Sequence, residues 1–322
     1  MTAPWITYRP DIKVLDCTVR DGGLINDHQF EDGFVKAVYE GCVDAGIDYM
    51  EIGYKNSKKI FAQDSFGAWK HCDEEDLRRI VGDNDTPLRL SAMADAGKSD
   101  WKTEILPKDQ SPLDLIRVAF YVYQVSEAVD MIKHCADMGY EVSANLMAVS
   151  TSQEAEVDQA LEILAGSPTQ TICVVDSFGA LYAEQVEVLV KKYLKAGEAQ
   201  GIQVGIHAHN NQQLAFANTI EAIIHGANRL DATMGGIGRG AGNCPLELLV
   251  GFLRNPKFRI RPIYQVLQDY VEPLRSEIEW GSYIQYNITG QLNQHPRAAI
   301  EHRGSDESDR FLDFYDKMIR DL

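Results

Sequence analysis

The stretch that decides the fold is Glu141–Asp176, which reads EVSANLMAVSTSQEAEVDQALEILAGSPTQTICVVD. A β-rich run, Glu141–Met147, opens this stretch, and a second one, Thr171–Asp176, closes it. Between them, Gln153–Leu164 spaces its apolar residues three and four positions apart, as a helix with one buried face does. A strand, a helix and a strand in this order predict a parallel βαβ unit.

The same unit recurs on both sides of this stretch. Six further β-rich runs are Lys13–Cys17, Tyr49–Gly53, Arg89–Met93, Ile116–Tyr121, Gln203–His207 and Arg229–Thr233. The helical segments between the runs include Glu31–Ala45, Ser126–Met138, Ala183–Gln200, Leu214–His225 and Pro245–Leu253. The helical pattern is weakest over Asp95–Pro112, which is polar and contains proline. Eight strands that alternate with helices predict an α/β fold, the (β/α)8 TIM barrel.

The length of the chain leaves room for one such barrel and a small addition. The 322 residues exceed the roughly 250 that a barrel typically needs. The alternation of strands and helices stops near Pro262, and no Ser/Gly linker precedes this point. We therefore expect a catalytic barrel over residues 1–261 and a small, mostly helical appendage over residues 262–322, packed on the barrel.

The composition narrows the class of protein. Lys and Arg number 31 and Asp and Glu 48, which gives a formal net charge of −17 and argues against nucleic acid as a partner. No apolar stretch approaches the ~20 residues that span a bilayer, and Arg9, Pro10 and Asp11 stand where a signal peptide would be apolar. The six cysteines form no CxxC pair, so neither a disulfide framework nor a structural zinc site is indicated. We expect a cytoplasmic protein that binds no membrane.

The ends of three predicted strands carry a candidate metal site. The active sites of TIM barrels lie at the carboxyl ends of the strands. His207 and His209 end the seventh strand and, two residues apart, point to the same face. Asp21 follows the first strand, which lies near the seventh in a closed barrel. Two imidazoles and a carboxylate suit a divalent Mn, Fe, Co, Zn or Mg ion. Asn243, after the eighth strand, is interpreted as a further ligand, as a cap on the helix that begins near Pro245, or as both.

Charged residues beside these candidates are interpreted as substrate contacts. Arg20 either stabilises negative charge on a substrate oxygen or forms a salt bridge. Lys55 either holds a carboxylate or faces solvent, and Glu51, inside the second strand, needs a partner such as Arg20 or the metal site. We group Glu51 and Lys55 with Arg239 as the candidate substrate-binding residues. The glycines around Arg239 do not match a phosphate-binding motif and favour a tight backbone path around the site.

Three motifs together resemble those of a known superfamily. DCTVRDGG, HAHNN and GGIGRGAGN, within residues 11–255, are similar to motifs of the DRE-TIM metallolyases, TIM barrels with an Asp-Arg-Glu signature. These include 4-hydroxy-2-oxovalerate aldolases, HMG-CoA lyases, isopropylmalate and homocitrate synthases and pyruvate carboxyltransferase domains. The resemblance implies that Asp21, His207 and His209 bind a divalent metal, with Asn243 as a further ligand, and that Arg20 stabilises an enolate.

Within the superfamily, the chain most resembles 4-hydroxy-2-oxovalerate aldolase-like proteins. Asp21-Gly22-Gly23 and Asn293-Gln294-His295-Pro296 are similar to segments of that group. The resemblance implies an aldolase that forms or uses the enolate of a 2-oxo acid, pyruvate, together with an aldehyde. The implied cofactor is Mn²⁺, with Mg²⁺, Co²⁺, Zn²⁺ and Fe²⁺ as alternatives. The expected partners are a second copy of the chain and an acylating aldehyde dehydrogenase.

Two other functions remain open at this point. One is a Claisen-type acyl-CoA condensing synthase or an HMG-CoA-lyase-like enzyme, which uses the same enolate-stabilising parts. The other is a barrel that has lost catalysis and serves as a scaffold. Metal content distinguishes the scaffold from the enzymes, and release of a thiol from acetyl-CoA distinguishes the synthase.

The residue that removes a proton is a separate question. Characterised catabolic aldolases of this group have a catalytic His three residues after the metal Asp, where this chain has Leu24. His28 is the nearest titratable candidate on the same loop, and a neutral imidazole suits a general base. It either acts as that base or packs at the start of the helix Glu31–Ala45. Other candidates are Glu51, Tyr283, Tyr286 and a metal-bound hydroxide.

Overall fold

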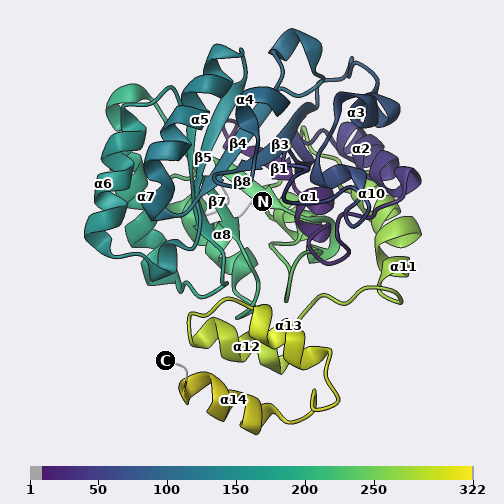
Figure 1. Cartoon of the computed structure of the whole chain (residues 1–322), viewed down its shortest axis with the longest axis vertical. Coiled ribbons are helices and arrows are strands. Elements are labelled where there is room, and N and C mark those ends of the chain that lie inside the picture. The colour runs from purple at the N-terminus through teal and green to yellow at the C-terminus, as the bar shows by residue number, and fades with distance from the viewer. Residues whose placement is uncertain (1–8, 321–322) are drawn as a thin grey trace, which may run out of the picture.

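Eight parallel strands close into a barrel in the computed structural model, which describes residues 9–320 (Figure 1). The strands are β1 (Lys13–Asp16), β2 (Tyr49–Tyr54), β3 (Arg89–Asp95), β4 (Leu115–Phe120), β5 (Glu141–Leu146), β6 (Thr171–Asp176), β7 (Gln203–Ala208) and β8 (Arg229–Ala232). Each pairs with the next in sequence, and the pairing of Lys13 with Arg229 joins β1 to β8. The predicted (β/α)8 barrel is confirmed.

Helices follow the strands, and the longer ones cover the outside of the barrel (Figure 1). They are α1 (Thr18–Gly22), α2 (Asp32–Ala45), α3 (Glu74–Val81), α4 (Trp101–Glu104), α5 (Val125–Asp137), α6 (Glu154–Ala165), α7 (Ala183–Gly197), α8 (Ala215–Ile224) and α9 (Leu246–Leu253). Their apolar faces and the outward faces of the strands form one buried core. All six cysteines are buried free thiols.

Two local structures differ from a regular barrel unit. The stretch Asp95–Pro112, where the helical pattern is weakest, forms only the four-residue α4 and a short 3-10 turn. Residues 18–22, which are not among the predicted helical segments, form the helix α1 directly after β1. Because all five residues of α1 are buried, Arg20 and Asp21 lie inside the barrel mouth rather than on a surface loop.

Helices dominate the chain after the barrel. They are α10 (Ile260–Val266), α11 (Glu272–Leu274), α12 (Ile284–Gln291), α13 (Arg297–Arg303) and α14 (Phe311–Arg320). α10 packs against α2, whereas α12, α13 and α14 share a separate apolar cluster that includes Tyr286 and Phe314 (Figure 1). We propose that residues 262–322 form a domain distinct from the barrel domain of residues 1–261.

The appendage is fastened to the barrel by side-chain hydrogen bonds. Asn293 Nδ2 donates to the carbonyl oxygen of Ser150 at 2.8 Å, and the Ser150 hydroxyl donates to Asn293 Oδ1 at 2.7 Å. His295 lies edge-on to Phe178, in the loop after β6, with 5.6 Å between ring centroids. The segment around Asn293 therefore lies over the loops that follow β5 and β6.

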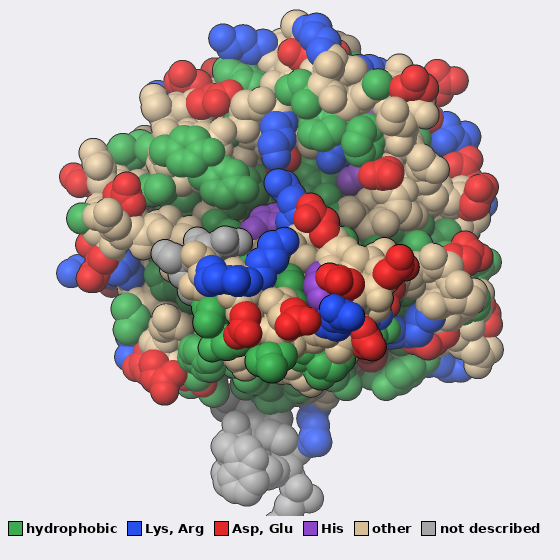
Figure 2. All heavy atoms as spheres, turned by 60° about the horizontal axis from the view of Figure 1, so that its bottom comes forward, with side chains coloured by type: hydrophobic (Ala, Val, Ile, Leu, Met, Phe, Trp, Pro, Cys, Tyr) green, Lys and Arg blue, Asp and Glu red, His purple; other side chains and the backbone are tan. Residues whose placement is uncertain are grey.

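Acidic and basic side chains are interspersed over the face shown in Figure 2, with hydrophobic groups between them. Among residues 9–320, no helix is both long enough and apolar enough to cross a membrane.

Candidate active site

The mouth of the barrel is organised by the junction of β1, α1 and β8. The Asp16 carboxylate accepts hydrogen bonds from the Thr18 backbone N–H at 3.1 Å and from the Thr18 hydroxyl at 2.6 Å. The same hydroxyl accepts a hydrogen bond from the backbone N–H of Met234, after β8, at 2.8 Å. These bonds fix the start of α1 against the loop after β8, so Asp21 faces the residues of that loop.

Asp21, His207 and His209 converge, as the sequence predicts. One potential ligand atom from each lies within 4.8 Å of the others, and all three side chains are buried. Asp21 Oδ2 lies 3.5 Å from His207 Nε2 and 3.9 Å from His209 Nε2. These atoms come from α1 and from the end of β7, so the site exists only because the barrel closes.

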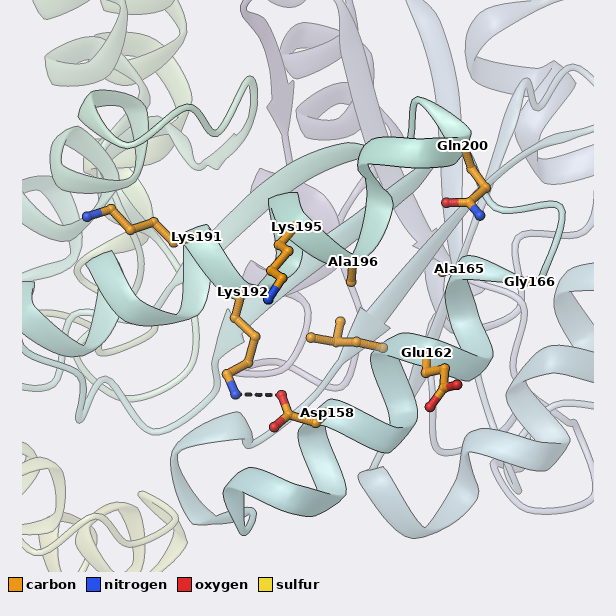
Figure 3. A pocket seen from close by; sticks show the side chains of 10 residues that line it. Asp158, Glu162, Ala165, Gly166, Lys191, Lys192, Lys195, Ala196 and Gln200 are labelled. Carbon is orange, nitrogen blue, oxygen red and sulfur yellow. Dashed lines mark hydrogen bonds and ion pairs between the residues drawn. The ribbon is translucent and has the colours of Figure 1, made fainter.

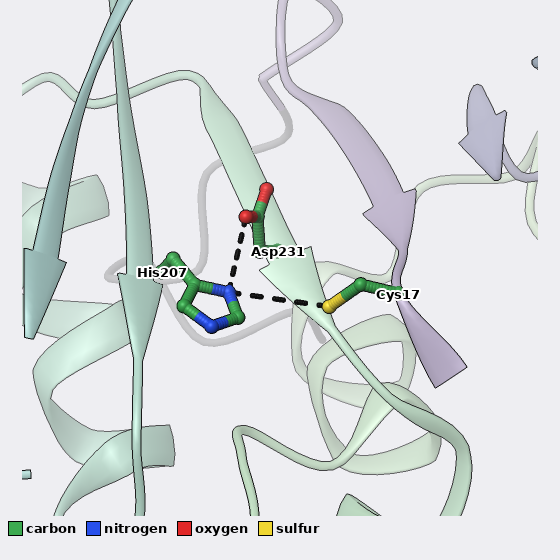
Figure 4. Close-up of side chains that lie close together, drawn as sticks. All are labelled: Cys17, His207 and Asp231. Carbon is green, nitrogen blue, oxygen red and sulfur yellow. Dashed lines mark hydrogen bonds and ion pairs between the residues drawn. The ribbon is translucent and has the colours of Figure 1, made fainter. Parts of the chain in front are cut away.

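A second carboxylate fixes the orientation of His207. Asp231, on β8, places Oδ2 at 3.1 Å from His207 Nδ1, while Cys17 Sγ lies 4.0 Å from the same nitrogen (Figure 4). Arg117, on β4, donates a hydrogen bond to that Asp231 oxygen. Nδ1 therefore carries the proton toward Asp231, and Nε2 is left buried with no hydrogen-bond partner among the described residues.

Asn243 joins this group through its amide nitrogen. Nδ2 donates to Asp21 Oδ1 at 2.9 Å, and Oδ1 is buried without a partner among residues 9–320. The alternative that Asn243 caps the following helix is wrong, because α9 has Pro245 at its N-cap and no side-chain cap. Gly238 permits this approach, since a Cβ there would lie 2.1 Å from Asn243 Nδ2 and 2.5 Å from Asp21 Oδ1.

The ionisation of Asp21 and His209 suits a cation. Burial lowers the pKa of His207, but hydrogen bonds with Asp21 and Asp231 outweigh it and raise that pKa, so a bound divalent ion would displace a proton from this ring. Burial raises the pKa of Asp21, but Arg20, His209 and His207 outweigh it and hold that pKa well below its usual value. Burial lowers the pKa of His209 well below 6.5. The donors that fit a divalent ion are an ionised carboxylate, a neutral imidazole, and His207 Nε2 and Asn243 Oδ1, which have no hydrogen-bond partner in the described part of the chain.

Arg20 is held in a fixed orientation beside the cluster of Asp21, His207 and His209. Its Nε donates to Glu51 Oε2 at 2.6 Å and its Nη1 donates to Asp21 Oδ2, while Nη2 is buried without a partner among the described residues. Arg117 donates to the same Glu51 oxygen at 3.0 Å. The two carboxylates thus hold the plane of the guanidinium, and one N–H group is left for another acceptor.

Lys55 and Arg239 differ in their relation to the cluster. Lys55 Nζ is paired with Glu74, at the start of α3, at 2.7 Å, so its charge is already matched by the chain. Arg239 donates from its backbone N–H to Asp21 Oδ1 at 3.3 Å and from Nη2 to the Ser177 carbonyl oxygen at 3.4 Å. Its Nε is buried with no partner among residues 9–320. Arg239 therefore lies at the site, and Lys55 is directed to α3.

The loop after α1 folds back on itself and brings His28 toward Gly23. Asp27 and His28 both have left-handed backbone conformations, with φ of 53° and 61°, and His28 N–H donates to the Gly23 carbonyl oxygen at 2.8 Å. A Cβ on Gly23 would lie 2.1 Å from His28 Nδ1, so only glycine leaves room for the ring. The ring is 1% exposed, lies edge-on to Tyr54, and has no hydrogen-bond partner among the described residues.

Leu24 lines a cavity beside the cluster. This cavity lies where the loops after β1 and β8 meet the appendage, and Arg239, Tyr286 and Arg303 also line it. Its lining comes from these loops, from the segment before α12, and from α12 and α13. A substrate that enters here would meet residues of the appendage as well as those of the barrel.

A second groove lies outside the barrel, between α6 and α7 (Figure 3). Lys192 is paired there with Asp158 and Glu154. The groove is on the helical surface, away from the carboxyl ends of the strands, and it includes none of the predicted site residues.

Sequence reasoning missed Asp231 and Arg117. Both are ionisable residues in the middle of strands whose neighbouring residues are apolar, and both are buried. A buried charge needs a partner, so an Arg in one central strand and an Asp in another were a usable signal for a pair inside the barrel.

Comparison with known proteins agrees with this geometry. The family model described as HMGL-like matches residues 119–267. Over 251 residues, the chain is 34% identical to an oxaloacetate decarboxylase of Mycobacterium tuberculosis. These aligned residues cover 77% of this chain and 71% of the decarboxylase. The chain is 29% identical over 257 residues to a 4-hydroxy-2-oxovalerate aldolase of Pelotomaculum thermopropionicum. The alignment covers 78% of this chain and 72% of the aldolase.

The fold has a counterpart among solved structures. The N-terminal domain of a Bacteroides vulgatus protein assigned as an aldolase superposes with a TM-score of 0.80 at 26% identity, covering 97% of this chain and 100% of that one. The chain belongs to the HMGL-like family and is a DRE-TIM metallolyase.

Proposed function

We propose that this chain is a divalent-metal-dependent aldolase that cleaves or forms a 4-hydroxy-2-oxo acid through the enolate of pyruvate. The observation that carries the proposal is the buried convergence of Asp21, His207 and His209 beside an Arg20 whose Nη2 has no partner among residues 9–320. The named aldolase relatives support the reaction class.

Asp21, His207 and His209 would hold the ion, with Asn243 Oδ1 as a further ligand, and we propose Mn²⁺ as that ion. A divalent ion in this position supplies Lewis acidity, which lowers the cost of charge on the keto oxygen of a 2-oxo acid. Asp231 and Arg117 keep the His207 ring in one orientation and one tautomer. The protein thus presents a prearranged donor set rather than one assembled on binding.

Arg20 and Arg239 are proposed to bind the substrate. Arg20 Nη2 donates to the oxygen on which the enolate charge develops, while Glu51 holds the guanidinium in place. Arg239, through the Nε that has no partner among residues 9–320, binds the substrate carboxylate. Leu24, which packs against the apolar cluster of Tyr54 and lines the neighbouring cavity, encloses the aldehyde end.

His28 is proposed to move the proton. In cleavage, a base takes the proton of the C4 hydroxyl, the C3–C4 bond breaks, and its electron pair becomes the enolate as the aldehyde leaves. C3 then takes up a proton and pyruvate is released. His28 is neutral at pH 7 because burial lowers its pKa well below 6.5. A neutral imidazole is the form that accepts a proton.

Decarboxylation of oxaloacetate is a second candidate. It is favoured by the relative at 34% identity that carries this name. Loss of CO2 from oxaloacetate leaves the same pyruvate enolate, so the same residues would serve both reactions. The two are separated by comparing pyruvate release from oxaloacetate and from 4-hydroxy-2-oxovalerate at equal concentrations.

Partners follow from the proposed reaction. The small molecules are a 2-oxo acid and an aldehyde, and the proposed protein partners are a second copy of the chain and an acylating aldehyde dehydrogenase that takes over the aldehyde.

The proposal is tested by deuterium exchange at the carbon beside the keto group, in a panel of 2-oxo acids. The Mn²⁺-loaded protein is expected to exchange the pyruvate methyl protons, and protein stripped of metal is not. His225→Ala is the matched control, because it removes a histidine from the partly buried Glu187–Glu221–His225 group on the outside of the barrel. Absence of exchange with every 2-oxo acid, in protein that holds its metal, would overturn the proposed function.

A further inference from the structure

Lys70 is a buried cation that neither the predicted site nor the family match explains. It ends a short 3-10 helix, Ala68–Lys70, in the connection from β2 to α3, and is 6% exposed. The neighbouring Lys55 and Lys58 are paired with Glu74 and Asp73. The Lys70 ammonium forms no hydrogen bond or ion pair with any residue between 9 and 320.

Aromatic rings surround the ammonium instead. Lys70 Nζ lies 4.2 Å from the ring centroid of Phe61, 4.6 Å from that of Tyr54 and 5.6 Å from that of Phe66. Such contacts attract a cation but satisfy none of its three N–H donors. A methionine would fill the same space without the desolvation cost of a charge. The retained charge therefore points to an anion that arrives from outside the chain.

Two carboxylates among residues 9–320, those of Asp95 and Asp27, act on the charge of Lys70, but neither forms an ion pair with it. The Asp95 carboxylate, at the end of β3, is bonded to Asn56 Nδ2 at 3.4 Å and lies beyond ion-pair distance of Lys70. Burial lowers the pKa of Lys70 to about 8, against the opposing effect of Asp95, so the side chain is still mostly charged at pH 7. The positive charge of the buried Arg20 lies nearby and adds to the attraction for an anion, whereas that of the exposed Lys98 is screened by solvent.

Tyr54 connects Lys70 to the candidate active site. The guanidinium carbon of Arg20 lies 5.9 Å from the Tyr54 ring centroid, and the His28 ring lies edge-on to the same ring at 5.3 Å. Since Lys70 Nζ and Arg20 share this ring, the two cations are no further apart than the sum of 4.6 and 5.9 Å. The outer carboxylate oxygens of an extended five-carbon diacid are about 7 Å apart, and a hydrogen bond of about 2.8 Å at each end lets such a molecule bridge two cations at this separation.

We propose that Lys70 binds a second carboxylate of the substrate, so that the preferred substrate is a 2-oxo diacid rather than a 2-oxo acid with an apolar tail. This rests on the proposed function, which sets the 2-oxo end of the substrate beside Arg20. The Lys70 ammonium then faces the opposite end of a five-carbon chain.

The test uses two substrates that differ only at the far end. 4-Hydroxy-2-oxoglutarate carries a carboxylate where 4-hydroxy-2-oxovalerate carries a methyl group, and both are cleaved at C3–C4 to pyruvate. The parent is expected to prefer the diacid. Lys70→Met is expected to reduce the ratio of the two kcat/KM values by about 10- to 100-fold, the usual worth of a charge-assisted hydrogen bond. Lys70→Arg keeps the charge and is expected to retain most of the preference.

Lys98→Met is the matched control, because it removes a charge from an exposed lysine near the same mouth. It is expected to leave the ratio within about threefold of the parent value, since exposed charges are screened. Thermal denaturation and metal content of each variant verify folding. Lys70→Met is expected to fold, because it removes an unpaired buried charge.

A binding measurement tests the role of Lys70 in the absence of turnover. Calorimetric titration with 2-oxoglutarate and 2-oxovalerate compares the same two end groups without a reaction. The parent is expected to bind the diacid more tightly, and Lys70→Met is expected to lose that difference. Equal affinities in the parent, or a preference that survives in Lys70→Met, would overturn the role of Lys70. If the parent binds the diacid selectively but exchanges no 2-oxo acid protons, the proposed function fails and the Lys70 subsite stands.

Discussion

Asp231 Oδ2 lies 3.1 Å from His207 Nδ1, and the same oxygen accepts a hydrogen bond from Arg117. The carboxylate belongs to β8 and the imidazole to β7, so adjacent strands hold the ring in place from behind. Because Nδ1 is engaged, Nε2 is the atom that faces Asp21 and His209. An ionic network inside the barrel therefore sets the direction of a side chain at its mouth.

Asp231→Ala is expected to weaken binding of the divalent ion by about 10- to 100-fold, the usual effect of losing a partner that orients a metal-binding His. Titration of metal-free protein with Mn²⁺ measures the change. Asp114→Ala is the control, because Asp114 lies at the opposite end of the barrel, where its carboxylate accepts from the Leu90 N–H. An Asp231→Ala protein with the parent affinity would show that the network does not support the site.

Arg20→Lys is expected to reduce kcat for cleavage of a 4-hydroxy-2-oxo acid by about 10²–10³, the effect of removing one donor to an oxyanion. A lysine cannot reproduce the planar fork that Glu51 and Asp21 hold. Metal content should stay at the parent level. Arg89→Lys, at the far end of β3, is the control for a general arginine effect. An unchanged kcat would give Arg20 a structural role only.

His28→Ala is expected to keep its metal and to slow deuterium exchange at the pyruvate methyl by about 10²–10⁴, the usual worth of a positioned base. The pH dependence of the exchange rate is a second test. Because burial lowers the pKa of His28 well below 6.5, the ring stays neutral as the pH falls from 7.5 to 6, and the parent rate should not fall on its account. Exchange at the parent rate in His28→Ala would leave a metal-bound hydroxide as the leading base.

The folded protein resists protonation of His28, whereas the unfolded chain accepts a proton near 6.5. Above that pH, His28 is neutral in both states, so pH does not change its contribution to the free energy of unfolding. As the pH falls below that value, the unfolded chain binds a proton at His28 and the folded protein does not, which lowers the free energy of unfolding. His28→Leu should lose part of this acid sensitivity. Urea denaturation of both proteins at pH 7.5 and pH 5.5 measures the difference.

Gly23→Ala is expected to displace His28, since the new methyl group would lie 2.1 Å from Nδ1. Exchange should slow as it does in His28→Ala, while the metal is retained. Gly33→Ala is the matched control, because a Cβ there meets nothing within 4 Å. That control should fold with a stability equal to the parent or higher by up to about 1 kcal/mol. Equal exchange rates in both variants would show that the His28 ring takes no part in catalysis.

The barrel and the convergent cluster could be predicted because each follows from a local pattern. Every βαβ unit is marked by its own residues, and a parallel barrel brings the ends of its strands together. His207, His209 and Asp21 stand at those ends, so their approach follows from closure alone.

Other parts of the site depend on contacts that no local pattern encodes. His28 reaches Gly23 because two residues that are not glycine, Asp27 and His28, adopt left-handed conformations. The pairing of Arg117 with Asp231 depends on which strand residues face the interior. Lys70 is enclosed by rings from its own loop and from β2, and its burial follows only from the folded path of that loop.

The most direct measurement of the central claim is the metal content of Asp21→Asn, read together with its pyruvate exchange rate. Asparagine keeps the shape of the side chain but removes the charge that His207 and His209 face. The parent is expected to hold one divalent ion per chain and to exchange pyruvate protons. Asp21→Asn, like His207→Ala and His209→Ala, is expected to lose both while remaining folded. An Asp21→Asn protein that keeps its ion and exchanges pyruvate protons at the parent rate would contradict the account.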